Sequence, residues 1–138
     1  RYAVNSSANA SFSSKNMALL GILIFAFILI HMGDFWLKMK MGELGMVESA
    51  KLGIEVKDMF ARVDLAFDQL WIVIFYVIGQ AVLGFHLWHG FQSAFQTLGI
   101  NHRKYTPIIK GLGKVYSIAV PLGFAIIPIL HYFDVFLF

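Results

Sequence analysis

The sequence predicts an all-α integral membrane protein, a helical bundle to which this chain contributes three transmembrane helices. Of its 138 residues, 59% are hydrophobic and only 14% are charged, whereas water-soluble domains usually carry about a quarter charged residues. Three apolar stretches each reach the roughly 20 residues that a helix needs to cross the hydrocarbon core of a bilayer. Backbone polar groups find no water to bond in lipid, so each stretch is expected to be helical.

The expected segments alternate between spans and polar connections. In chain order they are a polar segment over 1–16, a first span over 17–37, a loop over 38–68 with an amphipathic stretch before the second span, a second span over 69–98, a basic loop over 99–114 and a third span over 115–138. Asn16 and the serines before it are candidate caps for the first span, and Asp58 or Asp64 could open the helix that leads into the second. Gly99 is a candidate end of the second span.

The basic residues predict how the spans are oriented. The loop over 99–114 holds Arg103, Lys104, Lys110 and Lys114 and no acidic residue, whereas the loop over 38–68 mixes both signs. The positive-inside rule therefore places 1–16 and 99–114 in the cytoplasm and 38–68 outside. We interpret the net charge of +3 as a signal for topology and lipid contact, and we expect no nucleic-acid partner.

The chain contains no cysteine, which excludes disulfides, thiolate-held iron–sulfur clusters and covalently attached c-type haem. Histidine and methionine remain as candidate iron ligands. Four of the five histidines, His31, His86, His89 and His131, lie within apolar spans, and His102 lies in the basic loop. Ionisable side chains at such depth are costly and indicate a functional site. A hydrogen-bonded contact between helices is the alternative for each of them.

The depths of His31 and His86 predict two separate sites. His31 lies about 21 Å into the first span and His86 about 25 Å into the second, at 1.5 Å per residue. The two spans run in opposite directions, so these histidines are expected at levels separated by on the order of 15 Å. They cannot ligate one iron together. Because a bis-histidine haem needs a second imidazole at each level, the chain would supply half of the ligands for two haems.

Neighbouring residues leave some of the ligand choice open. His89 follows His86 by three residues on nearly the same helix face, so spacing does not choose between them. Gly90 and other small residues on the His86 face either form a groove for a flat porphyrin or allow close helix packing. His131, expected at the level of His31, is a candidate for the second ligand there.

One stretch resembles a known family. Residues 85–100 read FHLWHGFQSAFQTLGI and are followed by NHRKYTP and, later, by PLGFA. These resemble the fourth membrane helix and the segments after it in the cytochrome b subunit of succinate:quinone oxidoreductases. The similarity is to the single-subunit, two-haem type that includes fumarate reductases, in its form in Bacteroidetes-like bacteria. It covers nearly the whole chain and is strongest from about Val82 to Pro128.

The resemblance implies five membrane helices, of which this chain would be the last three, as part of a longer polypeptide. The third helix's ligand falls on His31, for the haem far from the catalytic subunits. The fourth helix's ligand falls on His86, followed by Gly90, for the haem near them. His89 would be a neighbour of that haem or of its propionates. His131 has no counterpart ligand.

The implied function is a non-catalytic, haem b-binding anchor without catalytic residues of its own. A flavoprotein subunit would oxidise succinate or reduce fumarate, and an iron–sulfur subunit would exchange electrons with the two haems and with a quinone, menaquinone. Such complexes belong to the respiratory chain and the tricarboxylic acid cycle, lie in the bacterial cytoplasmic (inner) membrane, and could pair as dimers. The alternatives are a cytochrome b anchor of another respiratory complex, such as a nitrate reductase or hydrogenase, and a haem-free membrane subunit.

Overall fold

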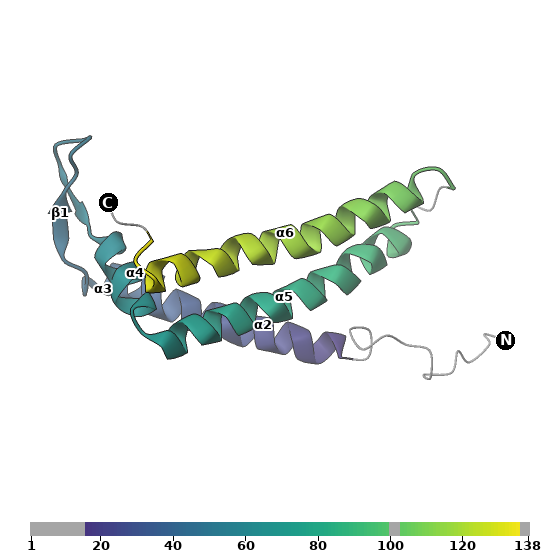
Figure 1. Cartoon of the computed structure of the whole chain (residues 1–138), viewed down its shortest axis with the longest axis horizontal. Coiled ribbons are helices and arrows are strands. Elements are labelled where there is room, and N and C mark those ends of the chain that lie inside the picture. The colour runs from purple at the N-terminus through teal and green to yellow at the C-terminus, as the bar shows by residue number, and fades with distance from the viewer. Residues whose placement is uncertain (1–15, 100–102, 136–138) are drawn as a thin grey trace.

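Three long helices lie along one another and carry a small cap at one end (Figure 1). The computed structural model describes residues 16–99 and 103–135. In chain order the elements are α2 (Met17–His31), η2 (Met32–Leu37), α3 (Lys38–Met41), β1 (Met46–Glu48), β2 (Glu55–Lys57), α4 (Met59–Phe67), α5 (Leu70–Thr97) and α6 (Thr106–Tyr132). The serine caps suggested before Asn16, together with His102, lie outside the described residues.

The first long helix combines three elements. α2, the π-helical turn η2 and the short α3 are continuous over Met17–Met41, four residues beyond the predicted span of 17–37. The helix ends at Gly42, whose φ of +78° lies in the left-handed region that glycine adopts without a steric penalty. η2 begins directly after His31. Short π-helical insertions occur frequently at functional sites.

All three long helices are long and apolar enough to cross a membrane, over Met17–Met41, Leu70–Phe95 and Thr106–Tyr132. The third begins at Thr106, so residues 106–114, expected as loop, form its first turns. The N-cap is Tyr105, and Pro107 lies in the first turn, where no intrahelical N–H bond is needed. Gly99 follows the end of α5 with a φ of +69°.

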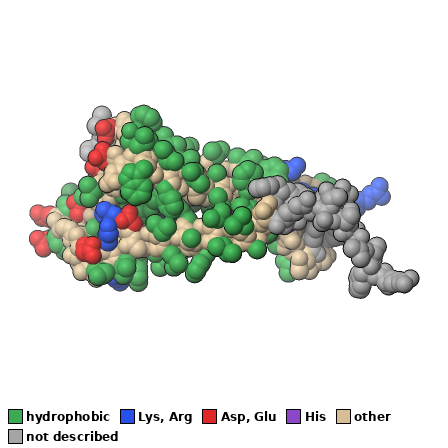
Figure 2. Space-filling view, turned by 90° about the horizontal axis from the view of Figure 1, so that it is seen from below, with side chains coloured by type: hydrophobic (Ala, Val, Ile, Leu, Met, Phe, Trp, Pro, Cys, Tyr) green, Lys and Arg blue, Asp and Glu red, His purple; other side chains and the backbone are tan. Residues whose placement is uncertain are grey.

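The outer surface of this bundle is apolar. Large side chains such as Phe25 (63% exposed), Ile78 (57%) and Phe124 (58%) point away from the other helices. Figure 2 shows hydrophobic side chains along most of the length of one face, with acidic side chains gathered at one end. Apolar surface on this scale is typical of proteins that contact lipid or other chains. The prediction of a mostly helical chain with three span-length helices is therefore confirmed, whereas its insertion into a bilayer stays a prediction.

The cap contains a hairpin that the sequence did not predict. β1 and β2 pair antiparallel, with Val47 opposite Val56, so the chain is not purely α. Strands of three residues are too short to give a recognisable alternating pattern. α4 corresponds to the expected amphipathic stretch, and its N-cap Asp58 accepts a hydrogen bond from the Ala61 N–H at 2.9 Å. We call this end of the bundle, with β1, β2 and α4, the hairpin end, and the opposite end the basic-loop end.

Glycines set the close approach of the long helices. A Cβ at Gly79 of α5 would lie 2.6 Å from the Phe27 ring of α2, and one at Gly113 of α6 would lie 2.2 Å from the Phe91 ring of α5. A Cβ at Gly84 would lie 3.3 Å from the Ser117 carbonyl oxygen of α6. α5 is therefore the central helix, with α2 packed on one side and α6 on another. Small residues in this role are typical of helix pairs in membranes.

Candidate functional site

His31 and His86 lie on facing helices at two different levels. His31 of α2 contacts Tyr76 of α5, and His86 of α5 lies against Gly21 of α2. Ten residues separate His31 from Gly21 on α2, and ten separate Tyr76 from His86 on α5. At 1.5 Å per residue the two contacts are about 15 Å apart along the helix pair. The two imidazoles are thus placed for two separate sites, not for one shared ion.

The His31 ring lies among aromatic side chains. Its Nδ1 is 3.2 Å from the Tyr76 hydroxyl oxygen. Phe27, one turn earlier, stacks on the ring at a centroid distance of 6.0 Å and an angle of 16°, and Phe35, one turn later, lies at 5.2 Å. Tyr76 itself is buried, and Phe67 of α4 meets it edge-on at 5.0 Å. The hydroxyl that contacts His31 is therefore held on a ring with little freedom to move.

An ionic cluster attaches α4 to the turn after His31. The Arg62 Nε donates to the Asp34 backbone oxygen at 3.1 Å, and its guanidinium also bonds the Asp34 carboxylate. Lys38 contacts the same carboxylate at 3.1 Å, and the guanidinium carbon lies 6.0 Å from the Phe35 ring centre. Asp34 is thus the point where α4 and η2 meet.

A cleft of about 470 Å³ opens beside this cluster. Its lining combines charged, amide and aromatic groups with aliphatic ones, namely Ile30, Gly33, Asp34, Lys38, Arg62, Gln69, Trp71, Ile72 and Phe75. The Trp71 indole N–H donates to the Gln69 side-chain oxygen at 2.8 Å. The cleft therefore offers both hydrogen-bonding groups and flat apolar walls at the level of His31.

The His86 ring faces a glycine instead of aromatic rings. Its Cε1 lies 3.9 Å from where a Cβ of Gly21 would stand. Its Nδ1 is fully buried and has no hydrogen-bond partner among the described residues. One turn further, a Cβ at Gly90 would lie 3.2 Å from the Met17 methyl group. A buried polar nitrogen without a partner costs about 1–3 kcal/mol, so this imidazole is suited to a group from outside the described residues.

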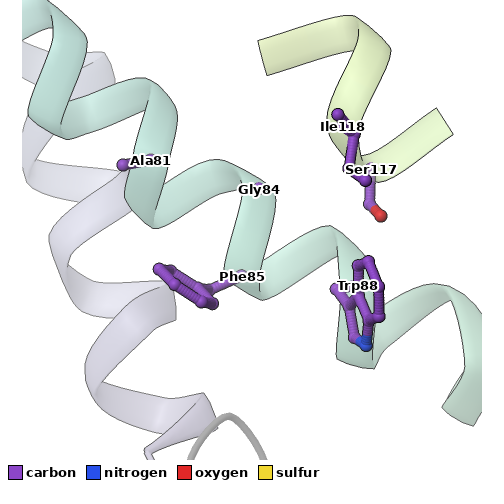
Figure 3. A pocket seen from close by; sticks show the side chains of 6 residues that line it. All are labelled: Ala81, Gly84, Phe85, Trp88, Ser117 and Ile118. Atoms are coloured by element: carbon purple, nitrogen blue, oxygen red, sulfur yellow. The ribbon is translucent and has the colours of Figure 1, made fainter. Parts of the chain in front are cut away.

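His89 has different surroundings from His86, although spacing alone did not distinguish them. It lines an open cleft of about 470 Å³ at the basic-loop end, together with Met17, Gly90, Ser93, Ala94, Thr97 and Leu98. A separate apolar cleft of about 360 Å³ (Figure 3) is lined by Ala81, Gly84, Phe85 and Trp88 of α5 and by Ser117 and Ile118 of α6. His86, on the α2 side, does not line this second cleft.

His131 joins α6 to the cap. Its Nδ1 lies 3.8 Å from an Asp64 carboxylate oxygen, and its ring packs against Phe60 and Phe67 of α4. These contacts explain why a histidine lies near the end of the third helix, and the explanation does not require His131 to bind iron. Within residues 16–99 and 103–135, no three His, Cys, Asp or Glu side chains are grouped so that they could hold a metal ion.

Sequence reasoning missed two interior residues of α5. Tyr76 is 6% exposed, and Gln80, one turn further, is 8% exposed with a buried Oε1 that has no partner among the described residues. A carboxamide in the middle of the apolar stretch from Leu70 to Val82 was a usable signal, because such groups need a partner in lipid. Tyr76 gave a weaker signal, since tyrosine is common in helices of this kind.

No protein-family model, curated protein or solved structure matches this chain. The fold and the site define its class coarsely: a mostly helical protein with three helices of membrane-spanning length and histidines at two levels of one helix pair. The likeness to a cytochrome b subunit stays a prediction.

His31 fits the demands of haem ligation at both ring nitrogens, whereas His86 fits them only at the nitrogen that would bind iron. Haem iron binds a neutral imidazole through one ring nitrogen while the other keeps its proton and a partner. In His31 the Nδ1 already contacts a hydroxyl, and Nε2 makes no hydrogen bond within the described residues. In His86 both nitrogens are without hydrogen bonds to the described residues. Coordination of iron through Nε2 would therefore break no hydrogen bond to the described residues in either histidine.

Proposed function

We propose that this chain is a haem b-binding membrane anchor of a succinate dehydrogenase or fumarate reductase complex in a bacterial cytoplasmic membrane. It would carry electrons between an iron–sulfur subunit and membrane quinone. The observation that supports this most is the placement of His31 and His86 on facing helices, about 15 Å apart along the bundle. Two imidazoles at two levels are what two haems stacked along the membrane normal require.

In this proposal the chain's residues hold and orient the cofactors. His31 and His86 each supply one axial ligand, and the second ligands come from helices outside this chain. A bis-histidine haem leaves no open iron position and so supplies one-electron transfer. The His86 ring lies close to α2 at Gly21, where a Cβ would be 3.9 Å from Cε1, an ordinary contact distance. Phe27 and Phe35 fix the plane of the His31 ring.

The two ends of the bundle would serve different partners. Lys110 and Lys114 of α6 lie toward the basic-loop end and are exposed, so this end suits the cytoplasmic iron–sulfur and flavoprotein subunits and anionic lipid headgroups. At the hairpin end, the cleft lined by Gln69, Trp71 and Phe75 suits the flat, carbonyl-bearing headgroup of a quinone such as menaquinone. Electrons would then cross most of the bilayer between the two ends.

The test is the absorbance spectrum of the complete protein, purified from its native membrane with its partners. We expect two b-type haems in the difference spectrum between the reduced and oxidised protein, together with a copurifying flavoprotein and an iron–sulfur protein. Absence of any haem signal would overturn the proposal in favour of a haem-free membrane subunit. Two haems with a nitrate reductase or hydrogenase as the copurifying enzyme would identify the anchor of another respiratory complex.

A further inference from the structure

If His31 binds iron through Nε2, the donor and the acceptor of its hydrogen bond with Tyr76 are both determined. Nδ1 lies 3.2 Å from the Tyr76 hydroxyl oxygen, and the two atoms come from α2 and α5, 45 residues apart in the chain. A neutral imidazole that coordinates iron through Nε2 carries its only proton on Nδ1. Nδ1–H must then donate, and the phenol oxygen must accept. The opposite arrangement, with the phenol donating to Nδ1, would put the ring proton on Nε2 and block ligation.

The position of Tyr76 is set by packing and not by the histidine alone. Its ring meets Phe27 at 5.2 Å, Phe67 at 5.0 Å and Phe75 at 5.9 Å between centroids. These rings come from three different helices, and Arg62 secures the helix that carries Phe67 through its bonds to Asp34. The acceptor oxygen is therefore fixed before any cofactor is bound. Such fixed outer partners determine the orientation and the basicity of a metal-binding imidazole.

We propose that Tyr76 is a positioning residue that selects the Nε2-ligating form of His31 and lowers the reduction potential of the haem bound there. The inference rests on the proposed haem function. A hydrogen bond donated by Nδ1–H makes the imidazole a stronger electron donor to the iron, and a stronger donor favours ferric over ferrous iron. His86 has no such partner among the described residues. The effect should therefore be confined to one of the two haems.

The experiment is a redox titration of the complete protein with its partner subunits, followed by haem absorbance. His31→Ala first identifies which of the two titrating components belongs to His31. Tyr76→Phe keeps the packed ring and removes only the oxygen. We expect both haems to be retained and the His31 component alone to move to a higher potential, by roughly two- to tenfold in its equilibrium constant, the effect of one hydrogen bond. Tyr116→Phe, at a half-exposed tyrosine of α6, is the matched control and should shift neither component.

The other possible results of this titration distinguish a failure of the Tyr76 role from a failure of the proposed haem function. An unchanged His31 component in Tyr76→Phe, or an equal shift of both components, would overturn the role of Tyr76 and leave the proposed haem function intact. A wild-type protein without haem would overturn the proposed function itself. If Tyr76→Phe loses the His31 haem, Tyr76→Gln decides, because its side-chain oxygen can accept from Nδ1–H. Retention of that haem in Tyr76→Gln supports the inference, and its loss overturns it.

Discussion

The two histidine levels of the α2–α5 pair are built in different ways. At the hairpin end, His31 lies among Phe27, Phe35 and Tyr76, and one of its nitrogens already contacts a hydroxyl of the same chain. The buried residues Phe35, Ala66, Phe67, Val73 and Tyr76 form the one hydrophobic cluster found among the described residues. Toward the basic-loop end, His86 faces the backbone at Gly21 and has a buried nitrogen without a partner among the described residues.

This difference shows how one helix pair can give one histidine a hydroxyl partner and leave a nitrogen of another without one. Phe27 and Phe35 lie beside the His31 ring and the Tyr76 hydroxyl contacts its Nδ1, although His31 as a whole is exposed on the bundle surface. Gly21 lies opposite the His86 ring and Gly90 lies against the Met17 methyl group, so neither position adds a side chain around His86. The His86 level should therefore depend more strongly on groups from outside the chain. The following substitutions test this contrast, beginning with the largest expected effect.

The strongest test removes one imidazole at a time. His86→Ala should abolish the haem toward the basic-loop end and leave the His31 haem detectable, because the two levels are about 15 Å apart and share no side chain. His31→Ala should have the reciprocal result. The measurement is the haem content and the number of components in a redox titration of the complete complex.

His89→Ala is the matched control for this test. His89 lines the open cleft with Met17 and Gly90 and does not lie against Gly21, so its replacement should retain both haems. If His86→Ala kept both haems and His89→Ala lost one, the ligand at this level would be His89.

A second test adds one methyl group between α2 and α5. In Gly79→Ala the new Cβ would stand 2.6 Å from the Phe27 ring, which cannot easily move because it packs against His31, Phe75 and Tyr76. Overpacking of this kind costs about 1–3 kcal/mol. We expect a lower thermal unfolding temperature in detergent and a disturbed His31 haem spectrum, with the His86 haem less affected.

Gly123→Ala supplies the comparison. It lies within α6 and a Cβ there would have no neighbour within 4 Å, so its unfolding temperature should equal or slightly exceed that of the wild type, since alanine favours helix. Equal destabilisation by both substitutions would contradict the close contact of α2 with α5 at Gly79.

The smallest expected effect concerns the attachment of the cap. Arg62→Gln removes a guanidinium that bonds both the backbone oxygen and the carboxylate of Asp34, with its side chain only 14% exposed. We expect a loss of about 1–2 kcal/mol of stability, measured as faster proteolysis within the segment from the hairpin to α4. Lys38→Gln, which removes a more exposed partner of the same carboxylate, should cost less than about 0.5 kcal/mol. A larger loss of stability in Lys38→Gln than in Arg62→Gln would show that the contact of Arg62 with Asp34 does not hold α4 in place.

Much of the fold follows from local features of the sequence. Leu70 to Leu98 could be predicted as one helix because it is a long apolar stretch ended by Gly99. Asp58 or Asp64 could be predicted as a cap because aspartate before a helical stretch satisfies its free N–H groups, and in the structure the cap is Asp58. The hairpin could not be predicted, since pairs such as Val47 and Val56 are defined by their partner and not by their neighbours in sequence. The structure begins α6 at Thr106, whereas the sequence predicts the third span from residue 115. The difference arises because the lysines between the two positions are typical of a loop.

For the candidate site, the sequence by itself determined which residues are unusual and how deep they lie. An imidazole in an apolar stretch is costly wherever that stretch packs, and depth follows from the rise per residue alone, so His31 and His86 could be assigned to two levels. Only the tertiary structure decided what each histidine contacts: Tyr76 for His31, Gly21 for His86, Asp64 for His131 and an open cleft for His89. The reason is physical. The cost of burial depends on one residue and its solvent, whereas a partner depends on the rotation and register of a second helix, which are set by packing contacts such as that of Gly79 with Phe27.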